Sequence, residues 1–197
     1  MRKIIPILLV AVVSAAAFSF SFTGDETQPE KIKWYTFLEA VELNKKTKKK
    51  IFIDVYTEWC HWCKVMDKNT FTHPVVIKYM NEKYYCVKLD AEMKDTIVFN
   101  NHTFVNPNPN IKRSTHQLAA SMLDNKLGYP SFVFFDENFG RLFYVQSYLT
   151  PSQFEPYIKF VGENSYLTVK WEEFNKIFKP EIPPPPPPAP PVIPQTH

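Results

Sequence analysis

Glycine is scarce in this chain of 197 residues, with only four occurrences, at positions 24, 128, 140 and 162. With so few glycines, neither a G-x-G-x-x-G dinucleotide loop nor a G-x-x-x-x-G-K-S/T phosphate loop can be written anywhere. A G-x-S-x-G nucleophile elbow is absent as well. The sequence therefore excludes the common glycine-rich nucleotide sites and this type of serine nucleophile.

A strong excess of one charge is also missing, because the formal net charge is only +3. Arg2 and Lys3 lie in a segment that we expect to be removed, and without them 21 basic residues face 20 acidic ones. Nucleic acid is therefore not an expected partner. The densest basic run, Lys45 to Lys50, is interpreted as a solvated helix end, with a site for an anionic partner as the alternative.

What is present is the composition of a folded protein, with 45% apolar and 16% aromatic residues. Residues 1–21 have the layout of a secretory signal peptide: two cations, an apolar run from Ile4 to Val13, and small residues around Ala15 and Ala17. The apolar run is short for a transmembrane helix of about 20 residues. We therefore expect an exported protein, or a membrane-anchored one if the segment stays uncleaved.

The other end of the chain is rich in proline. Residues 180–197 contain a run of consecutive prolines, which favours an extended polyproline II rod. We expect a spacer, a docking peptide or a tail with no partner, with too little apolar surface to pack. Residues 22–179 remain as one domain, long enough to fill a single core.

Apolar periodicity and turn residues predict alternating helices and strands in this domain. The expected elements are a helix from Trp34, a strand at 51–56, helices at 60–70 and 75–84, a strand at 83–90, a hairpin around Asn100-Asn101, a helix from Ser114, strands at 131–136 and 141–148, a helix from Pro151 and a closing helix from Trp171. Residues 91–129 depart from compact strand–helix spacing, and we interpret them as an insertion with structure of its own.

The chemistry centres on Cys60 and Cys63, a C-x-x-C motif placed where a strand runs into a helix. Unpaired N–H groups and the positive end of the helix dipole favour a thiolate at the helix N-terminus. Cys60 is therefore the expected nucleophile. Cys63, one turn inside the helix, is placed to attack a mixed disulfide and should be the less exposed thiol.

The segment from Asp54 to Lys64 closely resembles the thioredoxin superfamily: an apolar strand with one acid, then Glu-Trp-Cys-x-x-Cys-Lys, then a helix. Pro130, which precedes an apolar strand, matches the family's cis-proline. The resemblance covers residues 32–165. Within the superfamily, the sequence most resembles exported, periplasmic bacterial members, in which the loop before this proline is enlarged. The resemblance implies an α/β thioredoxin fold, a central mixed sheet flanked by helices, with the insertion before the cis-proline strand.

The resemblance also implies roles for single residues. Asp54 would accept the proton of the second cysteine, and burial in an apolar strand should raise its pKa towards neutrality. The alternative is a carboxylate that only bonds the neighbouring backbone. Pro130 would be cis, with Tyr129 presenting its backbone to an extended substrate. The alternative is a trans proline in a turn.

Four neighbours are expected to tune the redox pair: His61, Trp59, Trp62 and Lys64. A protonated His61 would lower the pKa of Cys60 and make the disulfide more oxidising. The two tryptophans would flank the thiols with apolar surface, unless they belong to the core. The Gly-Pro dipeptide usual in thioredoxin is absent, so the family's reductase role does not carry over unmodified.

The remaining cysteine and the histidines are given structural roles. Cys86 lies in an apolar strand and should face the core. His73 and His116 are expected at the surface or as helix caps. Cys60, His61, Cys63 and His73 could be drawn as zinc ligands, but a second C-x-x-C is lacking, so neither a metal nor another cofactor is expected.

These observations predict an exported thiol–disulfide oxidoreductase that acts on protein thiols and disulfides, served by a membrane-bound or exported redox partner. The direction of electron flow is left open. The insertion is expected to select the substrate. The alternative is a redox-inactive binding module or scaffold, in which Cys60 and Cys63 form a fixed structural disulfide.

Overall fold

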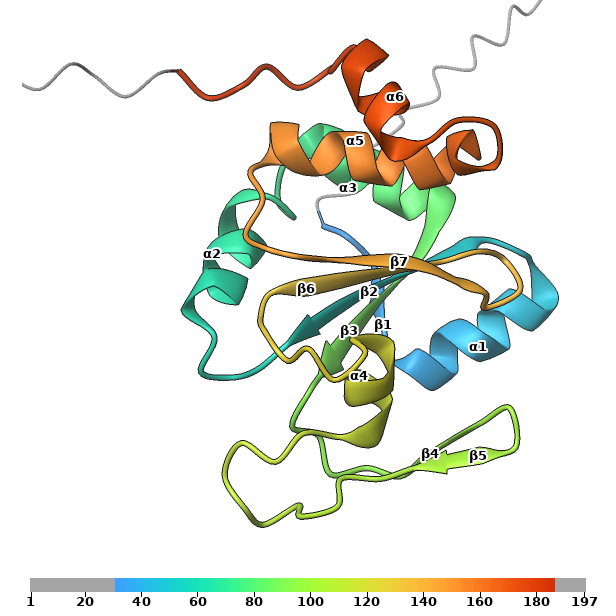
Figure 1. The fold of residues 1–197 in the computed structure, drawn as a ribbon, viewed down its shortest axis with the longest axis vertical. Helices are drawn as coiled ribbons and strands as arrows, with labels where there is room; N and C mark the ends of the chain where they lie inside the picture. Colours follow the sequence, from blue (N-terminus) through green and yellow to red (C-terminus); the bar gives the residue numbers. More distant parts are fainter. Residues whose placement is uncertain (1–30, 187–197) are drawn as a thin grey trace, which may run out of the picture.

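A computed structural model describes residues 31–186 of the chain, so the expected signal peptide and most of the proline-rich tail lie outside the described residues. Its main feature is a five-stranded mixed sheet in the order β1-β3-β2-β6-β7 (Figure 1). The strands of this sheet are β1 (Trp34–Tyr35), β2 (Lys50–Tyr56), β3 (Tyr84–Asp90), β6 (Ser131–Phe135) and β7 (Arg141–Gln146). The helices are α1 (Phe37–Lys46), α2 (His61–Asn69), α3 (Pro74–Lys83), α4 (Gln117–Met122), α5 (Pro151–Gly162) and α6 (Trp171–Ile177), with a 3-10 turn at Ser165–Leu167.

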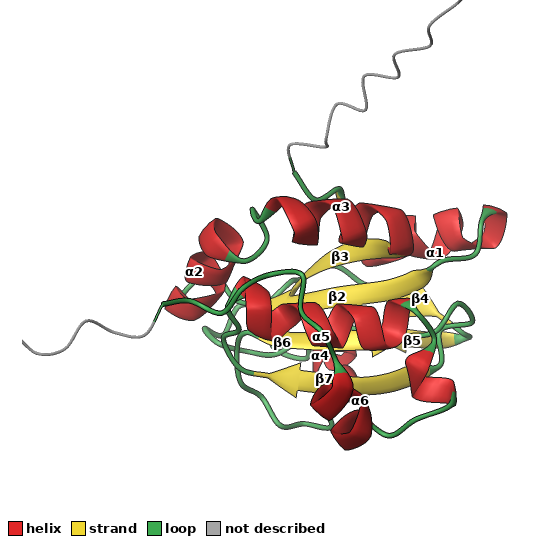
Figure 2. Cartoon of the chain, turned by 90° about the horizontal axis from the view of Figure 1, so that it is seen from above, coloured by secondary structure: helices red, strands yellow, loops and turns green. Residues whose placement is uncertain are grey.

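Helices cover both faces of the sheet, and alternate residues of the central strand β2 serve the two sides (Figures 1 and 2). Phe52 packs with residues of α2, α3 and α5, whereas Ile51 and Ile53 pack with α1 and α4. Strand β2 pairs with β3 in parallel and with β6 in the antiparallel sense. Because helices cover both faces, residues 50–55 of β2 are buried, which explains why the strand is mostly apolar.

The insertion between β3 and β6 contributes to the core as well as to the surface. It contains a hairpin of β4 (Ile97–Phe99) and β5 (His102–Phe104). Asn100 and Asn101 connect its strands with φ values of 50° and 60°, as a two-residue turn of this hand requires. Ile97 and Leu118 are buried against the α1 side of the sheet. The hairpin was predicted; the burial of its base was not.

The start of the domain differs from the prediction. Trp34 belongs to the short strand β1, and the first helix begins only at Phe37. Thr36 caps that helix, because its hydroxyl accepts from the Glu39 N–H while the Glu39 carboxylate accepts from the Thr36 N–H. Lys50, expected in solvent, is instead 3% exposed at the start of β2, with its Nζ 2.8 Å from Glu137 Oε1.

Helix α4 also begins later than expected. Its N-cap is His116, whose Nδ1 accepts from the Leu118 N–H at 3.1 Å, and not Ser114. Ser114 instead donates its hydroxyl to Asn106. His116 is fully buried, so of the two expected positions, surface or helix cap, it takes the cap. His73 is half-buried and precedes α3 at the N-cap position.

The first residues of the proline-rich segment pack against the domain, contrary to the expectation for this tail. Ile182 is 4% exposed. The buried carboxylate of Glu155, on α5, accepts hydrogen bonds from the backbone N–H groups of Glu181 and Ile182 at 2.9 to 3.1 Å. A buried charge needs such partners. Within residues 31–186, no helix combines the length and apolar character needed to cross a membrane.

Candidate redox site

The two cysteines of the motif lie at the start of α2 and are joined as a disulfide. Cys60 is the N-cap residue, and its Sγ accepts from the Cys63 N–H at 3.0 Å. This sulfur therefore lies where the free N–H groups of the helix favour negative charge. The expected contrast in exposure is absent from the disulfide form, in which Cys60 is 4% and Cys63 3% exposed.

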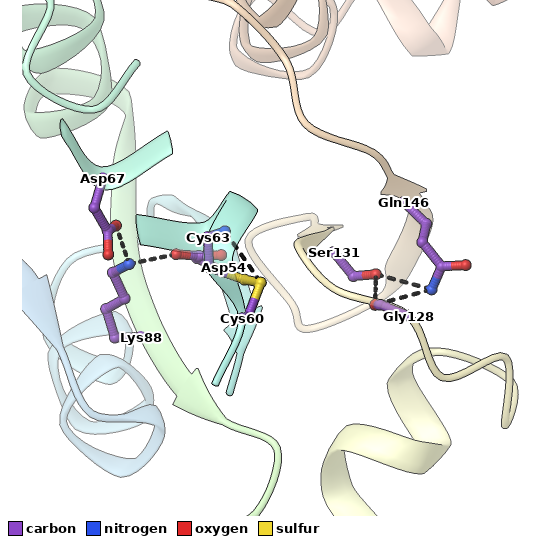
Figure 3. The surroundings of a disulfide bond; sticks show 8 residues. All are labelled: Asp54, Cys60, Cys63, Asp67, Lys88, Gly128, Ser131 and Gln146. Carbon is purple, nitrogen blue, oxygen red and sulfur yellow. Dashed lines mark hydrogen bonds and ion pairs between the residues drawn. A yellow bond between two sulfur atoms is a disulfide. The ribbon is translucent and has the colours of Figure 1, made fainter. Parts of the chain in front are cut away.

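A buried acid lies behind the disulfide (Figure 3). Asp54 is 2% exposed, and it faces Lys88 across the β2–β3 pair. Lys88 Nζ lies 2.5 Å from Asp54 Oδ2 and also contacts Asp67 on α2. Burial raises the pKa of Asp54 to about 6, although the positive charge of Lys88 limits the rise. Asp54 is therefore a carboxylate that can gain or lose a proton near neutrality.

One oxygen of the Asp54 carboxyl lacks a hydrogen-bond partner among the described residues. Asp54 Oδ1 and the hydroxyl of Thr57 are buried, and neither has a hydrogen-bond partner among residues 31–186. Desolvation lowers the pKa of Lys88, but Asp54 and Asp67 outweigh it, so that the pKa lies above its ordinary value. Lys88 therefore stays protonated while the Asp54 proton comes and goes. Asp54 Oδ1 can therefore accept a proton without first giving up a hydrogen bond to another described residue.

The loop before β6 lies beside the disulfide and contains a cis peptide bond between Tyr129 and Pro130. Pro130 itself is buried. The N–H and C=O of Tyr129 make no hydrogen bond to any other residue among those that the structure describes. An extended peptide could pair with this backbone in the manner of an added strand.

Trp59 is half exposed and is held by the insertion. Its Nε1 donates to Glu92 Oε1 at 2.7 Å, and the Arg113 guanidinium lies 4.8 Å from the centre of its ring. The Tyr129 ring packs edge-on against it at 5.9 Å. The insertion thus reaches the residue immediately before Cys60, in agreement with its expected place at the rim of the site.

Trp62 lies on the other side of the motif and is 53% exposed, so neither tryptophan of the motif is a core residue. Its ring centre lies 5.2 Å from that of Tyr148 and 5.6 Å from that of His61. A groove of about 500 Å³ runs from Trp62 and Tyr148 to Tyr129 and Pro130. His61 and Lys64 point into solvent, whereas Cys86 is buried in the core as predicted.

Several residues of the site were missed from the sequence. Lys88 and Asp67 complete the charge network of Asp54, Arg113 covers Trp59, and Gln146 contacts the loop before β6. One signal was available, since a lysine inside the apolar strand at 84–90 needs a buried partner and Asp54 is the acid of the neighbouring strand. Among the described residues, no group of three or more His, Cys, Asp or Glu side chains gathers as metal ligands would.

A family model described as "Thioredox_DsbH: Protein of unknown function, DUF255" matches residues 23–180 of this chain. The chain belongs to the Thioredox_DsbH family. Among solved structures, this Thioredox_DsbH protein is similar to a thioredoxin-fold protein from Helicobacter pylori, with a TM-score of 0.51 and 16% identity over 66% of this chain and 79% of that one. The thioredoxin fold inferred from the sequence is confirmed.

Curated relatives match parts of the chain. The Thiol:disulfide interchange protein DsbD of Haemophilus ducreyi is 31% identical over 140 residues, which is 68% of this chain and 21% of the relative. Spermatogenesis-associated protein 20 of Mus musculus is 33% identical over 67 residues, 34% of this chain and 8% of the relative. The matches thus span no more than about a fifth of the length of these relatives. Family, fold and the paired cysteines of this Thioredox_DsbH chain together support a role of the thiol–disulfide oxidoreductase type.

Proposed function

We propose that the protein is exported and exchanges disulfides with protein substrates through Cys60 and Cys63. The observation that carries this proposal is the placement of both sulfurs at the start of a helix, beside a buried carboxyl whose pKa is about 6. The relative named a thiol:disulfide interchange protein supports it. Export rests on residues 1–21 alone, and the periplasm is the compartment in which a bacterial protein of this kind would meet protein disulfides.

In the reducing direction, the Cys60 thiolate attacks one sulfur of a substrate disulfide. The other substrate sulfur leaves as a thiolate and takes a proton from water. Cys63 then gives its proton to Asp54 and attacks Cys60, which releases the second substrate thiolate. Two electrons pass from the cysteine pair to the substrate, and the pair ends as the disulfide seen in Figure 3.

The reverse sequence oxidises a substrate dithiol and leaves the pair reduced. Either cycle needs a partner that restores the starting state, and a membrane-bound or exported dithiol or disulfide protein would supply or remove the two electrons. The backbone of Tyr129 would pair with the extended substrate segment, and Trp62 would cover the same groove from the motif side. No metal or other cofactor takes part in these steps.

The direct test is an exchange assay with the purified protein lacking residues 1–21. Insulin with dithiothreitol as reductant reports reduction, and reduced ribonuclease with oxidised glutathione reports oxidation. We expect catalysis in at least one of the two assays, at enzyme concentrations well below that of the substrate. A rate equal to that without protein in both assays would contradict the proposal.

We further propose that the insertion selects the substrate. Removing residues 95–125 would take Ile97 and Leu118 out of the core, so a smaller change is needed. Replacing Arg113 with alanine removes the guanidinium over Trp59 and exposes the indole. We expect kcat/KM for protein substrates to change by about 2- to 5-fold, as for loss of one cation–π contact at an exposed site.

The matched control is Lys112→Ala, which removes a neighbouring exposed cation. We expect it to leave kcat/KM for protein substrates unchanged, and both variants to act normally on a small disulfide. Equal effects of the two substitutions, or none from Arg113→Ala, would contradict a selective role of this contact.

A further inference from the structure

Gln146 occupies an unusual position for an exposed side chain. It ends the edge strand β7, directly opposite Ser131 in the register of β6 and β7. Its Nε2 lies 3.0 Å from the Gly128 carbonyl and 3.0 Å from Ser131 Oγ (Figure 3). The same nitrogen lies 2.8 Å from the Lys126 carbonyl. One amide group thus bonds the chain on both sides of Tyr129 and Pro130.

The segment that Gln146 holds has little other support. Residues 126–130 belong to no helix or strand, and no backbone N–H among the described residues bonds their carbonyls. The Ser131 hydroxyl, itself bonded by the amide, donates to the Gly128 carbonyl at 2.7 Å. A Cβ at Gly128 would lie 2.7 Å from Gln146 Cδ, so the side chain packs directly on this glycine.

We propose that Gln146 is a positioning residue, which fixes the segment Gly128–Pro130 at the distance from Cys60 that a bound substrate peptide requires. The inference rests on the proposed function, since it concerns the binding of the protein substrate. The side chain bonds Gly128 and Ser131, on either side of Tyr129 and Pro130, and lines the groove beside them. It points away from the sulfurs (Figure 3). Its loss therefore weakens substrate binding and leaves the chemistry of the disulfide unchanged.

The use of the amide nitrogen gives the proposal a sharp test. Gln146→Glu keeps the shape of the side chain but places a carboxylate oxygen against two carbonyl oxygens. Gln146→Leu removes the donor without adding charge. Gln153 offers the matched control, because it uses its carbonyl oxygen to accept from the Thr150 N–H and is also exposed. Gln153→Glu makes the same chemical change and retains that bond.

KM and kcat are measured with insulin, and the rate is measured separately with hydroxyethyl disulfide, which has no peptide groups to pair with Tyr129. For both Gln146 variants we expect KM for insulin to rise about 5- to 30-fold, as for the loss of one or two hydrogen bonds. We expect kcat, the rate with hydroxyethyl disulfide and the reduction potential of the cysteine pair to equal those of the wild type. Gly128→Ala should act in the same direction, because its Cβ displaces Gln146.

An unchanged KM in both Gln146 variants would overturn the inference and leave the proposed function standing. A parallel loss of the rate with hydroxyethyl disulfide would overturn it too, since the side chain would then act on the redox pair. An equal rise of KM in Gln153→Glu would show a nonspecific effect of added charge and have the same consequence. If the wild type itself did not exchange disulfides, both proposals would fall together.

Discussion

Replacing Cys60 with serine is expected to reduce disulfide exchange to the rate without protein. Cys60 Sγ lies at the N-terminus of α2, where it accepts a hydrogen bond from the Cys63 N–H. A serine hydroxyl in its place is not ionised at neutral pH. Without a thiolate at this position, the first bond to the substrate cannot form. The measurement is the initial rate with insulin and dithiothreitol. Activity of Cys60→Ser above background would contradict the role of this sulfur.

Two further variants separate attack from release. Cys63→Ser retains the attacking thiol but lacks the second one, so it should accumulate a mixed disulfide that is visible on a non-reducing gel and disappears with reductant. Cys86→Ala is the control, because Cys86 is a buried core residue outside the motif. We expect it to retain exchange activity and to trap nothing. A mixed disulfide that formed in Cys60→Ser and not in Cys63→Ser would reverse the assigned order of the two cysteines.

Replacing Asp54 with asparagine is expected to stabilise the protein at neutral pH. Burial raises the pKa of Asp54 to about 6, whereas the unfolded chain releases this proton near pH 4. Between these values the folded state binds more protons than the unfolded state, so the free energy of unfolding falls as the pH rises through this window. A rise of about two pKa units corresponds to roughly 3 kcal/mol at pH 7, a penalty that asparagine does not carry.

The check is urea unfolding of Asp54→Asn and wild type at pH 4 and pH 7.5, with the pair oxidised in both. We expect the variant to be more stable by about 2 to 3 kcal/mol at pH 7.5 and nearly equal to the wild type at pH 4. The matched control is Asp67→Asn, which changes the exposed carboxylate that contacts the same lysine, Lys88. It should show no such gain in stability. A loss of stability in Asp54→Asn at pH 7.5 would contradict the raised pKa.

Asp54→Asn should also exchange disulfides more slowly than the wild type. Asparagine cannot accept the Cys63 proton, so release of the mixed disulfide loses its base, an effect of about 10²-fold for a positioned general base. In the wild type the rate of release should rise with pH through about 6, as Asp54 becomes a carboxylate. Asp54→Asn should lack that inflection. A stable but slow variant would indicate that this acid is retained for its chemistry.

Local signals were the ones that sequence reasoning used well. The Asn100–Asn101 hairpin was predicted because the turn chemistry lies in the turn itself. The start of the first helix was misplaced because Trp34 has the right spacing from Phe37. A capping box, Thr36 followed by Glu39, marks the true start in the sequence. The helix boundary is therefore encoded locally, by the cap and not by the apolar spacing.

Contacts between segments distant in the chain could not be predicted from the sequence. The pairing of Lys88 with Asp54 depends on the register of β2 against β3, and that of Gln146 with the loop before β6 depends on the register of β6 against β7. A shift of one residue in either register would turn the side chain to the other face. The hydrogen bond from the Glu181 N–H, in the tail, to the Glu155 carboxylate likewise joins residues that are 26 positions apart. The cis bond before Pro130 was expected only through resemblance, since local sequence does not determine it.

The central claim is that Cys60 and Cys63 cycle between dithiol and disulfide, and the reduction potential of this pair tests it most directly. The protein is equilibrated in graded dithiothreitol and glutathione buffers, and the free thiols are alkylated and counted by mass. The account predicts a two-electron transition between about −270 mV, the value of a thioredoxin reductant, and about −120 mV, that of a strong oxidant. A pair that stays oxidised throughout this range would be a structural disulfide and would contradict the account.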